Sequence, residues 1–247
     1  MKKITLFLLL MSAVLTGIAQ PAKSSFLESL RQMQDAYRQP EYLSFDILYR
    51  YAPADQPDQF EDSISGNARI NRNRFWYSLD NTESVNSGDL EIMVFREDKI
   101  VYLRKPVARE TQAGGLQWIA LLDSALSANM HTGFQVNEQP DCLQLVMEFA
   151  PDQSCRRIEY LVDRKTGWLR KMISIVKADQ LYDPSVRSAI DSDQTYAVVE
   201  TIFSNYSTVV FDTQVLDSQH YVRKSGDRYV CVGEYEQYSV FLGSAGL

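Results

Sequence analysis

The sequence has few of the residues from which catalytic and metal sites are most often built. Only two histidines occur in 247 residues, His131 and His220, and neither has a sequence context that suggests a triad partner. The chain contains no GxSxG motif, no GxGxxG motif and no phosphate-binding loop. Asp191 and Asp193 form an isolated D-x-D that lacks the rest of a calcium loop. We therefore expect no bound metal, no cofactor and no nucleophilic catalysis.

One catalytic class stays open on the sequence alone. The 32 acidic residues allow many pairings of the kind that glycoside hydrolases use, although no spacing selects one pair. A hydrolase with an unrecognised acid pair is therefore kept as a hypothesis, to be tested by looking for two close carboxylates in a polar cleft.

Cysteine is also scarce, with Cys142, Cys155 and Cys231 as the three examples and no CxxC unit. An odd number leaves at least one thiol unpaired within the chain. Cys142 and Cys155 fall at opposite ends of a predicted hairpin, too far apart for a disulfide. We expect all three to be packing residues.

The long apolar run of the chain is confined to its beginning. Lys2 and Lys3 precede the apolar segment 4–18, and the small residues of Gly17-Ile18-Ala19 provide a cleavage signal. This pattern predicts a secretory signal peptide over residues 1–19 and export to the periplasm. No second long apolar run follows, so no transmembrane segment is expected after cleavage.

The charge balance limits the partners. The net charge is −7, and removal of Lys2 and Lys3 with the signal peptide would lower it to −9. An acidic surface argues against nucleic acid as a partner and against docking on anionic lipid through the overall charge.

The periodicity predicts two helices. Ser24 or Ser25 is a candidate N-cap for a helix that ends near Gln39, before Pro40, with an apolar stripe of Phe26, Leu30, Met33 and Tyr37. Residues 115–129 repeat apolar side chains at helical spacing and predict a second helix.

Alternating segments predict strands over most of the remaining chain. The segment YLSFDILYRYA, the segments around Asn71–Asn73, the pair LEIMVFRE and KIVYLRKP, and the meander from Cys142 to Lys177 all alternate or are bounded by turn residues. In the meander, one row of side chains forms a wall: Leu143, Leu145, Met147, Phe149, Ile158, Tyr160 and Val162. Because no βαβ alternation occurs, the fold class is α+β, a curled antiparallel sheet of about ten strands, an incomplete β-barrel, with helices over its concave face.

The order of these elements resembles the LolA-like family of periplasmic lipoprotein carriers, in its divergent form from Bacteroidetes-type bacteria. The matching segments are the signal peptide ending GIAQ, the helix SSFLESLRQMQDAYRQ, the strand YLSFDILYRY, ISGNARINRNRFWYSLDNTESV, EIMVFREDKIVYL and CRRIEYLVDRKTGWLRKMISIV. The resemblance implies a half-barrel domain over 20–206 and a non-enzymatic carrier of acyl chains. Residues 207–247 depart from the family and are expected to form a C-terminal strand or hairpin extension packed on the same domain. No counterpart of the family's lid-positioning arginine is found, so no functional residue is carried over.

Two non-enzymatic functions follow from these observations. The first is a periplasmic carrier that binds lipid or lipoprotein acyl chains in an apolar cavity. Alternation predicts its lining as Phe45, Ile47, Tyr49, Phe75, Tyr77, Ile92, Val94, Trp118, Leu122, Leu145 and Met147. The second is an adaptor of a cell-envelope assembly, in which side chains fill the cavity and Tyr221, Tyr229, Tyr235 and Tyr238 contact a partner protein.

Overall fold

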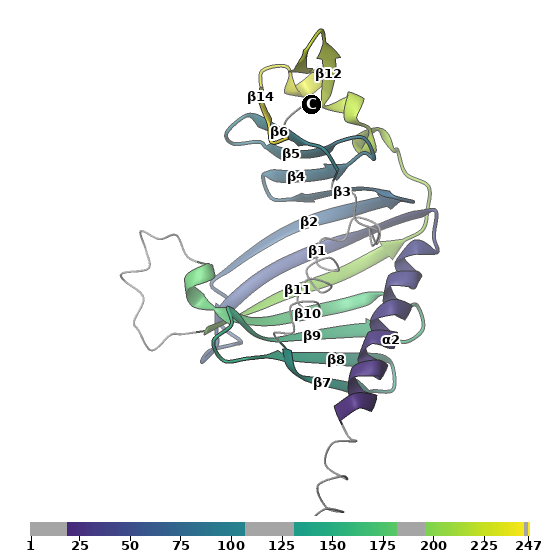
Figure 1. The fold of residues 1–247 in the computed structure, drawn as a ribbon, viewed down its shortest axis with the longest axis vertical. Helices are drawn as coiled ribbons and strands as arrows, with labels where there is room; N and C mark the ends of the chain where they lie inside the picture. Colours follow the sequence, from purple (N-terminus) through teal and green to yellow (C-terminus); the bar gives the residue numbers. More distant parts are fainter. Residues whose placement is uncertain (1–18, 107–130, 182–195, 245–246) are drawn as a thin grey trace, which may run out of the picture. The chain divides into compact units, whose positions relative to one another are not determined.

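A computed structural model describes residues 19–106, 131–181, 196–244 and 247 of the chain. In this part the chain forms one α-helix and fourteen strands (Figure 1). The helix is α2 (Ala19–Arg38), and the strands are β1 (Tyr42–Pro53), β2 (Asp62–Asn71), β3 (Arg74–Leu79), β4 (Thr82–Asn86), β5 (Glu91–Phe95), β6 (Ile100–Arg104), β7 (His131–Glu138), β8 (Cys142–Phe149), β9 (Cys155–Asp163), β10 (Leu169–Lys177), β11 (Tyr196–Ser207), β12 (Val222–Ser225), β13 (Arg228–Cys231) and β14 (Ser239–Leu242).

Twelve of the strands form one hydrogen-bonded sheet. Their order is β14-β6-β5-β4-β3-β2-β1-β11-β10-β9-β8-β7, and β12 pairs with β13 in a separate hairpin. The sheet is mixed, because β14 runs parallel to β6. The prediction of an all-antiparallel sheet of about ten strands is therefore wrong in both respects, whereas the curl of the sheet stays a prediction.

The missed strands have a simple physical reason. The segment of β4, TESVN, is short and mostly polar, so its sequence has no apolar alternation from which to predict a strand. The last strand, β14, follows the β12–β13 hairpin and returns to the edge strand β6, a pairing that no local pattern predicts.

The single described helix has the predicted apolar stripe. Phe26, Leu30, Met33 and Tyr37 are all buried, and α2 ends at Arg38, before Pro40. The predicted start at Ser24 or Ser25 is wrong, because the helix already begins at Ala19. The second predicted helix, residues 115–129, and the predicted signal segment 1–18 lie outside the described residues.

The chain divides into two compact units. Unit 1 contains residues 1–35, 51–60 and 125–200, and unit 2 contains residues 36–50, 61–124 and 201–247. The predicted assignment of a domain over 20–206 and an extension over 207–247 stays a prediction.

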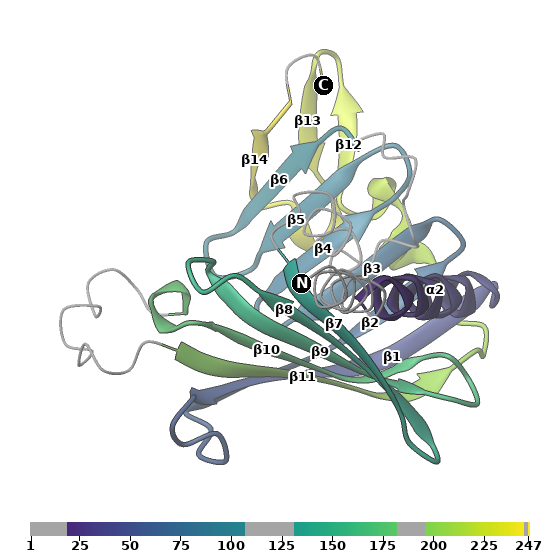
Figure 2. The same cartoon turned by 60° about the horizontal axis from the view of Figure 1, so that its bottom comes forward.

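In unit 1 the wall predicted for the meander shares one face of β8 and β9. Leu143 lies opposite Val162, Leu145 opposite Tyr160, and Met147 opposite Ile158. Helix α2 contacts β7 at this face, where the rings of Phe26 and Phe134 lie 4.9 Å apart and Phe134 is opposite Met147 (Figures 1 and 2).

The opposite face of the unit 1 strands is mixed, because Val146 and Cys142 are buried there beside polar side chains. The side chains of Asn137, Gln144 and Glu159 form a hydrogen-bonded row across β7, β8 and β9, and Arg157 pairs with Glu159 at 2.7 Å. The alternation in β8 is therefore incomplete, because Val146, the neighbour of Leu145 on the other face, is as buried as Leu145 itself.

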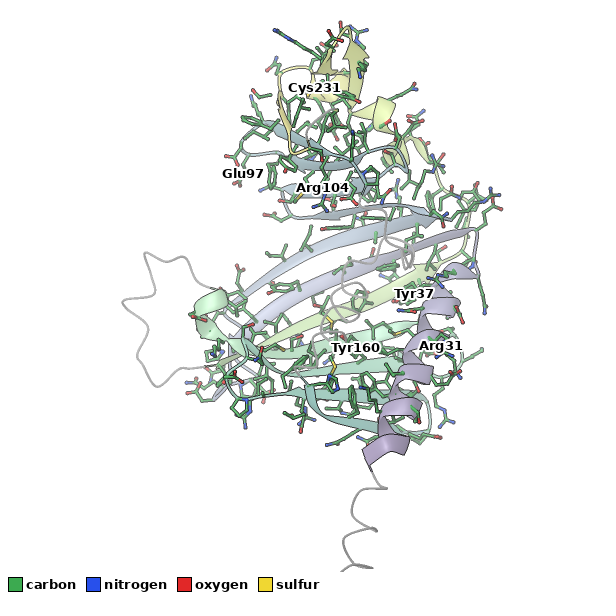
Figure 3. The ribbon with its side chains drawn as sticks, in the orientation of Figure 1. Arg31, Tyr37, Glu97, Arg104, Tyr160 and Cys231 are labelled. Atoms are coloured by element: carbon green, nitrogen blue, oxygen red, sulfur yellow. The ribbon has the colours of Figure 1, made fainter. Side chains whose placement is uncertain are left out.

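The three cysteines are free thiols, as expected. Cys142 is buried and donates to Gln139 Oε1 at 3.1 Å, while Cys155 and Cys231 (the latter labelled in Figure 3) are half-buried. Burial raises the pKa of the Cys155 thiol to about 11, which keeps it protonated and poorly nucleophilic at neutral pH.

Candidate functional site

The two faces of strands β3 to β6 in unit 2 differ sharply in how they are covered. Cross-strand pairing places Trp76, Val85, Ile92 and Leu103 in one row on one face. The same pairing places Tyr77, Ser84, Met93, Tyr102 and Phe241 in one row on the other face, which runs from β3 to β14. We call the first the packed face and the second the aromatic face.

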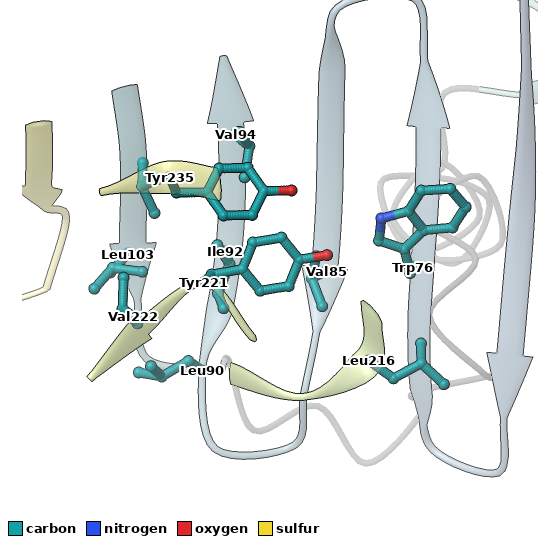
Figure 4. Packing of buried hydrophobic residues seen from close by; sticks show 11 residues of the cluster. Trp76, Val85, Leu90, Ile92, Val94, Leu103, Leu216, Tyr221, Val222 and Tyr235 are labelled. Carbon is teal, nitrogen blue, oxygen red and sulfur yellow. The ribbon is translucent and has the colours of Figure 1, made fainter. Parts of the chain in front are cut away.

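The C-terminal extension covers the packed face. Leu216, Tyr221, Val222 and Tyr235 are at most 3 % exposed and pack in one cluster with the strand residues (Figure 4). Leu216 and Tyr235 end the 3₁₀ turns Gln214–Leu216 and Gly233–Tyr235, Val222 begins β12, and Tyr221 lies between the turn Ser218–His220 and β12. Because the chain fills this face with its own side chains, it leaves little apolar surface there for a ligand.

A buried carboxylate fixes the extension to the sheet. Glu83 in β4 is 2 % exposed and accepts hydrogen bonds from Trp76 Nε1 at 2.9 Å and from Tyr235 Oη at 3.3 Å. The guanidinium of Arg96 forms an ion pair with Glu83 and lies over the ring of Tyr235, 5.6 Å from its centroid. The carboxylate oxygens of Glu83 therefore have their hydrogen-bond and ion-pair partners within the protein itself.

The buried carboxylate of Glu83 raises the pKa values of the groups that surround it. Burial disfavours the charged guanidinium of Arg96, but the facing carboxylate of Glu83 outweighs it and the pKa of Arg96 is raised. Burial and the charge of Glu83 likewise raise the pKa of the Tyr235 phenol. This cluster is a structural ion pair with its aromatic partners.

The aromatic face has no comparable cover from the extension. Tyr77, Met93, Phe95 and Tyr102 are half-buried, and Phe241 is 53 % exposed. The rings of Phe75 and Tyr77 stack with an interplanar angle of 6° and centroids 6.3 Å apart. The face thus combines large apolar side chains with partial access to solvent, which suits contact with an apolar ligand.

Glycine makes room for one of these side chains. A Cβ at Gly243, just after β14, would come within 1.8 Å of Tyr102 Oη. The absence of a side chain at Gly243 therefore lets Tyr102 lie close to the end of the edge strand.

The structure divides the predicted lining residues of unit 2 between these faces. Phe75, which is buried, and Tyr77, which is half-buried, lie on the aromatic face, whereas Ile92 and Val94 are fully buried on the packed face. The residues on β3 and β5 that were grouped as one lining therefore do not share one face.

The predicted lining residues of β1 lie near the end of α2. Phe45 is 2 % exposed and packs edge-on against Tyr37 and Phe203 and at a tilt against Tyr206, with Tyr37 Oη and Tyr206 Oη 2.5 Å apart. Ile47 and Tyr49 are half-buried on the same strand.

The remaining predicted lining residues are in other parts of the chain. Leu145 and Met147 are fully buried in the wall of unit 1, beside Tyr160 (Figure 3). Trp118 and Leu122 lie outside the described residues. Whether any of the predicted residues lines a cavity stays a prediction.

Sequence reasoning missed most of the aromatic face. Met93, Phe95, Tyr102 and Phe241 are not among the predicted lining residues, because local alternation alone does not tell which side of β5, β6 and β14 is covered. The alternation in EIMVF and IVYLR gives two sets of side chains, and the burial pattern shows that only Ile92, Val94, Val101 and Leu103 enter the core.

Among the described residues, two acid pairs are each bridged by an arginine, and a third pair, Asp80 and Glu97, accepts hydrogen bonds from the exposed Asn81 amide. Glu83 and Glu234 both contact Arg96, while Asp141 and Asp163 both contact Arg170. The arginine neutralises the charge that a general base or nucleophile would need, so neither of these bridged pairs resembles the carboxylates of a glycoside hydrolase.

The tyrosines of the tail are mostly core residues. Tyr221 and Tyr235 are at most 1 % exposed, and Tyr229 and Tyr238 are half-buried against the same cluster. Most of the tyrosine surface that the adaptor hypothesis assigns to a partner protein is therefore buried by packing within the chain.

No helix in the described part of the chain is long and apolar enough to span a membrane. Within the same residues, no cluster of three or more His, Cys, Asp or Glu side chains is placed to hold a metal ion.

Comparison with known proteins gives distant structural similarities only. No family model matches the sequence, and no curated protein matches it. An uncharacterised conserved protein from Thermus thermophilus is similar at TM-score 0.46 and 9% identity, covering 88% of this chain and 99% of that chain.

Two further solved structures are similar at the same distant level. A LolA superfamily protein from Nitrosomonas europaea has TM-score 0.36 and 9% identity, covering 78% of this chain and 97% of that chain. The MucA/MucB complex of Pseudomonas aeruginosa gives 0.42 and 13%, covering 84% of this chain and 63% of that chain. The chain is thus distantly similar in structure to LolA superfamily proteins and to MucB, at a level too low to assign a function.

Proposed function

We propose that the protein is a non-enzymatic carrier or binding protein of the periplasm that holds lipid or lipoprotein acyl chains against the aromatic face of unit 2. The observation that supports this proposal is the unequal cover of the two faces of β3 to β6. The packed face is closed by the extension, and the aromatic face keeps half-buried Tyr77, Met93, Phe95 and Tyr102.

The physical basis of binding would be reversible apolar burial. Each CH₂ removed from water contributes about 0.8 kcal/mol, so a long acyl chain supplies enough free energy without any specific polar contact. Flexible methionine and flat aromatic rings adapt to such a chain, because they offer large contact area with few fixed geometric demands.

The first experiment asks whether the protein carries an apolar ligand. Native mass spectrometry of protein purified from the exporting cell should show copurified lipid, and the delipidated protein should bind a fluorescent fatty-acid probe. Absence of copurified lipid together with no uptake of the probe would contradict the proposal.

A matched pair of variants then locates the site. The double substitution Met93→Gln and Phe95→Gln removes apolar surface from the aromatic face, and we expect probe affinity to fall by roughly tenfold or more. The control Tyr229→Gln removes a half-buried aromatic side chain of the extension and should leave probe affinity unchanged. Equal losses in both variants would place the ligand elsewhere.

A further inference from the structure

Three exposed large apolar side chains of unit 2 lie on two neighbouring strands, while the other two in the described chain, Val209 and Val210, follow β11. The three are Val230, Phe241 and Leu242, which belong to β13 and β14. Their side chains are 36 %, 53 % and 50 % exposed. β14 and the β12–β13 hairpin lie side by side (Figures 1 and 2).

Three cations with no carboxylate partner in the described part of the chain lie on the hairpin next to these apolar side chains, and Lys224 Nζ lies over the Tyr229 ring, 5.6 Å from its centroid. Arg223, Lys224 and Arg228 are exposed, and none has a carboxylate within ion-pair distance among the described residues. The hairpin contains a single acid, Asp227, so its net charge is +2 in a chain of −7. Lys105, also exposed, is tied to the end of β14 by a hydrogen bond from its backbone N–H to Ser244 Oγ at 3.1 Å.

The nearby acids do not cancel these cations. Glu234, whose side chain is 56 % exposed, is paired with Arg96 at 3.5 Å and lies 3.9 Å from His220 Nε2. Glu236 is exposed and follows the 3₁₀ turn Gly233–Tyr235, outside the hairpin. Three cations with one acid therefore remain on the hairpin itself.

We propose that the β12–β13 hairpin and the edge strand β14 form a docking surface for an anionic phospholipid bilayer. Arg223 and Arg228 lie on the hairpin with Val230, and Arg223 is directly opposite Val230 on one of its faces, because paired residues of neighbouring strands share a face. This face presents a cation to lipid phosphates and an apolar side chain to the interfacial region, as in other peripheral membrane contacts.

Edge-on contact explains the position of the exposed apolar residues on β14. Consecutive residues of a strand point to opposite faces, so Phe241 and Leu242 flank the edge on both sides. A bilayer that meets the edge can receive both side chains at once, which a partner on one face cannot.

A peptide strand added to the edge fits less well than a bilayer. Ser239 N–H and Gly243 N–H point toward β6, where they donate to Lys99 O and Leu103 O. Only Val240 and Leu242 therefore direct their peptide groups outward, which is too short an edge for stable strand addition.

Because the net charge of the whole chain is negative, attraction to an anionic bilayer is confined to this basic surface and weakens as salt is added.

This proposal stands independently of the proposed carrier function, because it concerns the surface of the protein and needs no bound ligand. A vesicle cosedimentation assay tests it with the exported, processed protein. Its N-terminus must be verified by intact mass, since an uncleaved segment 4–18 would bind vesicles by itself. Phosphatidylethanolamine vesicles with about one third phosphatidylglycerol are compared with phosphatidylcholine vesicles, at low and at physiological salt.

We expect binding to the anionic vesicles that weakens with salt, and little binding to the neutral ones. The triple variant Arg223→Gln, Lys224→Gln and Arg228→Gln should weaken binding at low salt by roughly 100-fold, because each cation near such a surface contributes about fivefold. The double variant Phe241→Ser and Leu242→Ser should weaken it by about tenfold, and the remaining binding should become more salt-sensitive.

A control with the same charge change separates local docking from overall charge. Arg31→Gln, Arg156→Gln and Lys165→Gln remove three exposed cations of unit 1 and should leave vesicle binding within about twofold of the parent. All variants should retain the parent's thermal unfolding curve, since the substituted side chains are exposed. Absence of vesicle binding, equal binding to both vesicle types, or equal losses in the two triple variants would overturn the proposal, as would capture of an acidic protein by the hairpin without vesicle binding.

Discussion

The two units cover an apolar face of their strands by different means. In unit 1, a regular helix, α2, places Phe26 against Phe134 of β7, and the facing wall of β8 and β9 is wholly apolar. In unit 2, an extension of short turns and strands covers β3 to β6 and is fixed by the buried charge of Glu83. A helix buries its stripe without needing polar anchors, because its own backbone groups are paired. An irregular segment needs such anchors to hold one arrangement.

Removal of the anchor in unit 2 should have the largest effect. Glu83→Ala leaves Arg96, Trp76 Nε1 and Tyr235 Oη without their shared acceptor, and we expect the free energy of unfolding to fall by about 3–5 kcal/mol. Hydrogen exchange should accelerate over residues 213–243. The control Glu91→Gln breaks a partly exposed ion pair with Arg104 (Figure 3) and should cost less than about 1 kcal/mol. A Glu83→Ala protein as stable as the control would show that the extension is held by apolar packing alone.

The matching change in unit 1 removes an apolar contact. Phe26→Ala takes away a fully buried ring that packs on Phe134, and we expect a loss of about 3 kcal/mol. Hydrogen exchange should accelerate in α2 and β7 and stay unchanged over residues 213–243. If Glu83→Ala and Phe26→Ala accelerated hydrogen exchange over the same residues, the helix of unit 1 and the extension of unit 2 would not be stabilised independently.

The smallest effect concerns the turn that links β9 to β10 in unit 1. Asp163 accepts hydrogen bonds from the backbone of Lys165 and Thr166 and pairs with Arg170. Although partial burial acts against the carboxylate, the contacts with Arg170 and Thr166 lower the pKa of Asp163 from 3.8 to about 2. The carboxylate therefore stabilises the fold above about pH 4, and this contribution is lost as the pH falls toward about 2.

Denaturation at a series of pH values measures this contribution. Asp163→Asn should flatten the decrease in unfolding free energy between about pH 4 and pH 2, because the variant has no carboxylate to protonate. Arg170→Gln should flatten it as well, since it removes the partner charge. An unchanged acid-side slope in both variants would show that this turn does not contribute.

The sequence predicted unit 1 better than unit 2, and the covering segments explain why. The stripe of α2 and the wall from Leu143 to Val162 follow from periods of about 3.6 and 2 residues, and the structure places each on one face. In unit 2, periodicity identified strands β5 and β6 but not which side of each strand is covered. Ile92 and Val94 were therefore grouped with Phe75 and Tyr77, which lie on the opposite face.

The sequence by itself determined the predominance of strands, the buried stripe of α2, the turns of the meander and the free thiols. These features depend on local periodicity, turn residues and the spacing of cysteines along one hairpin. Only the tertiary structure decided which face of β3 to β6 the extension covers, because that choice depends on contacts between residues more than one hundred positions apart, such as Glu83 and Tyr235. The same long-range packing left the aromatic face half-exposed and brought Phe241 and Leu242 to the edge of the sheet beside the basic hairpin.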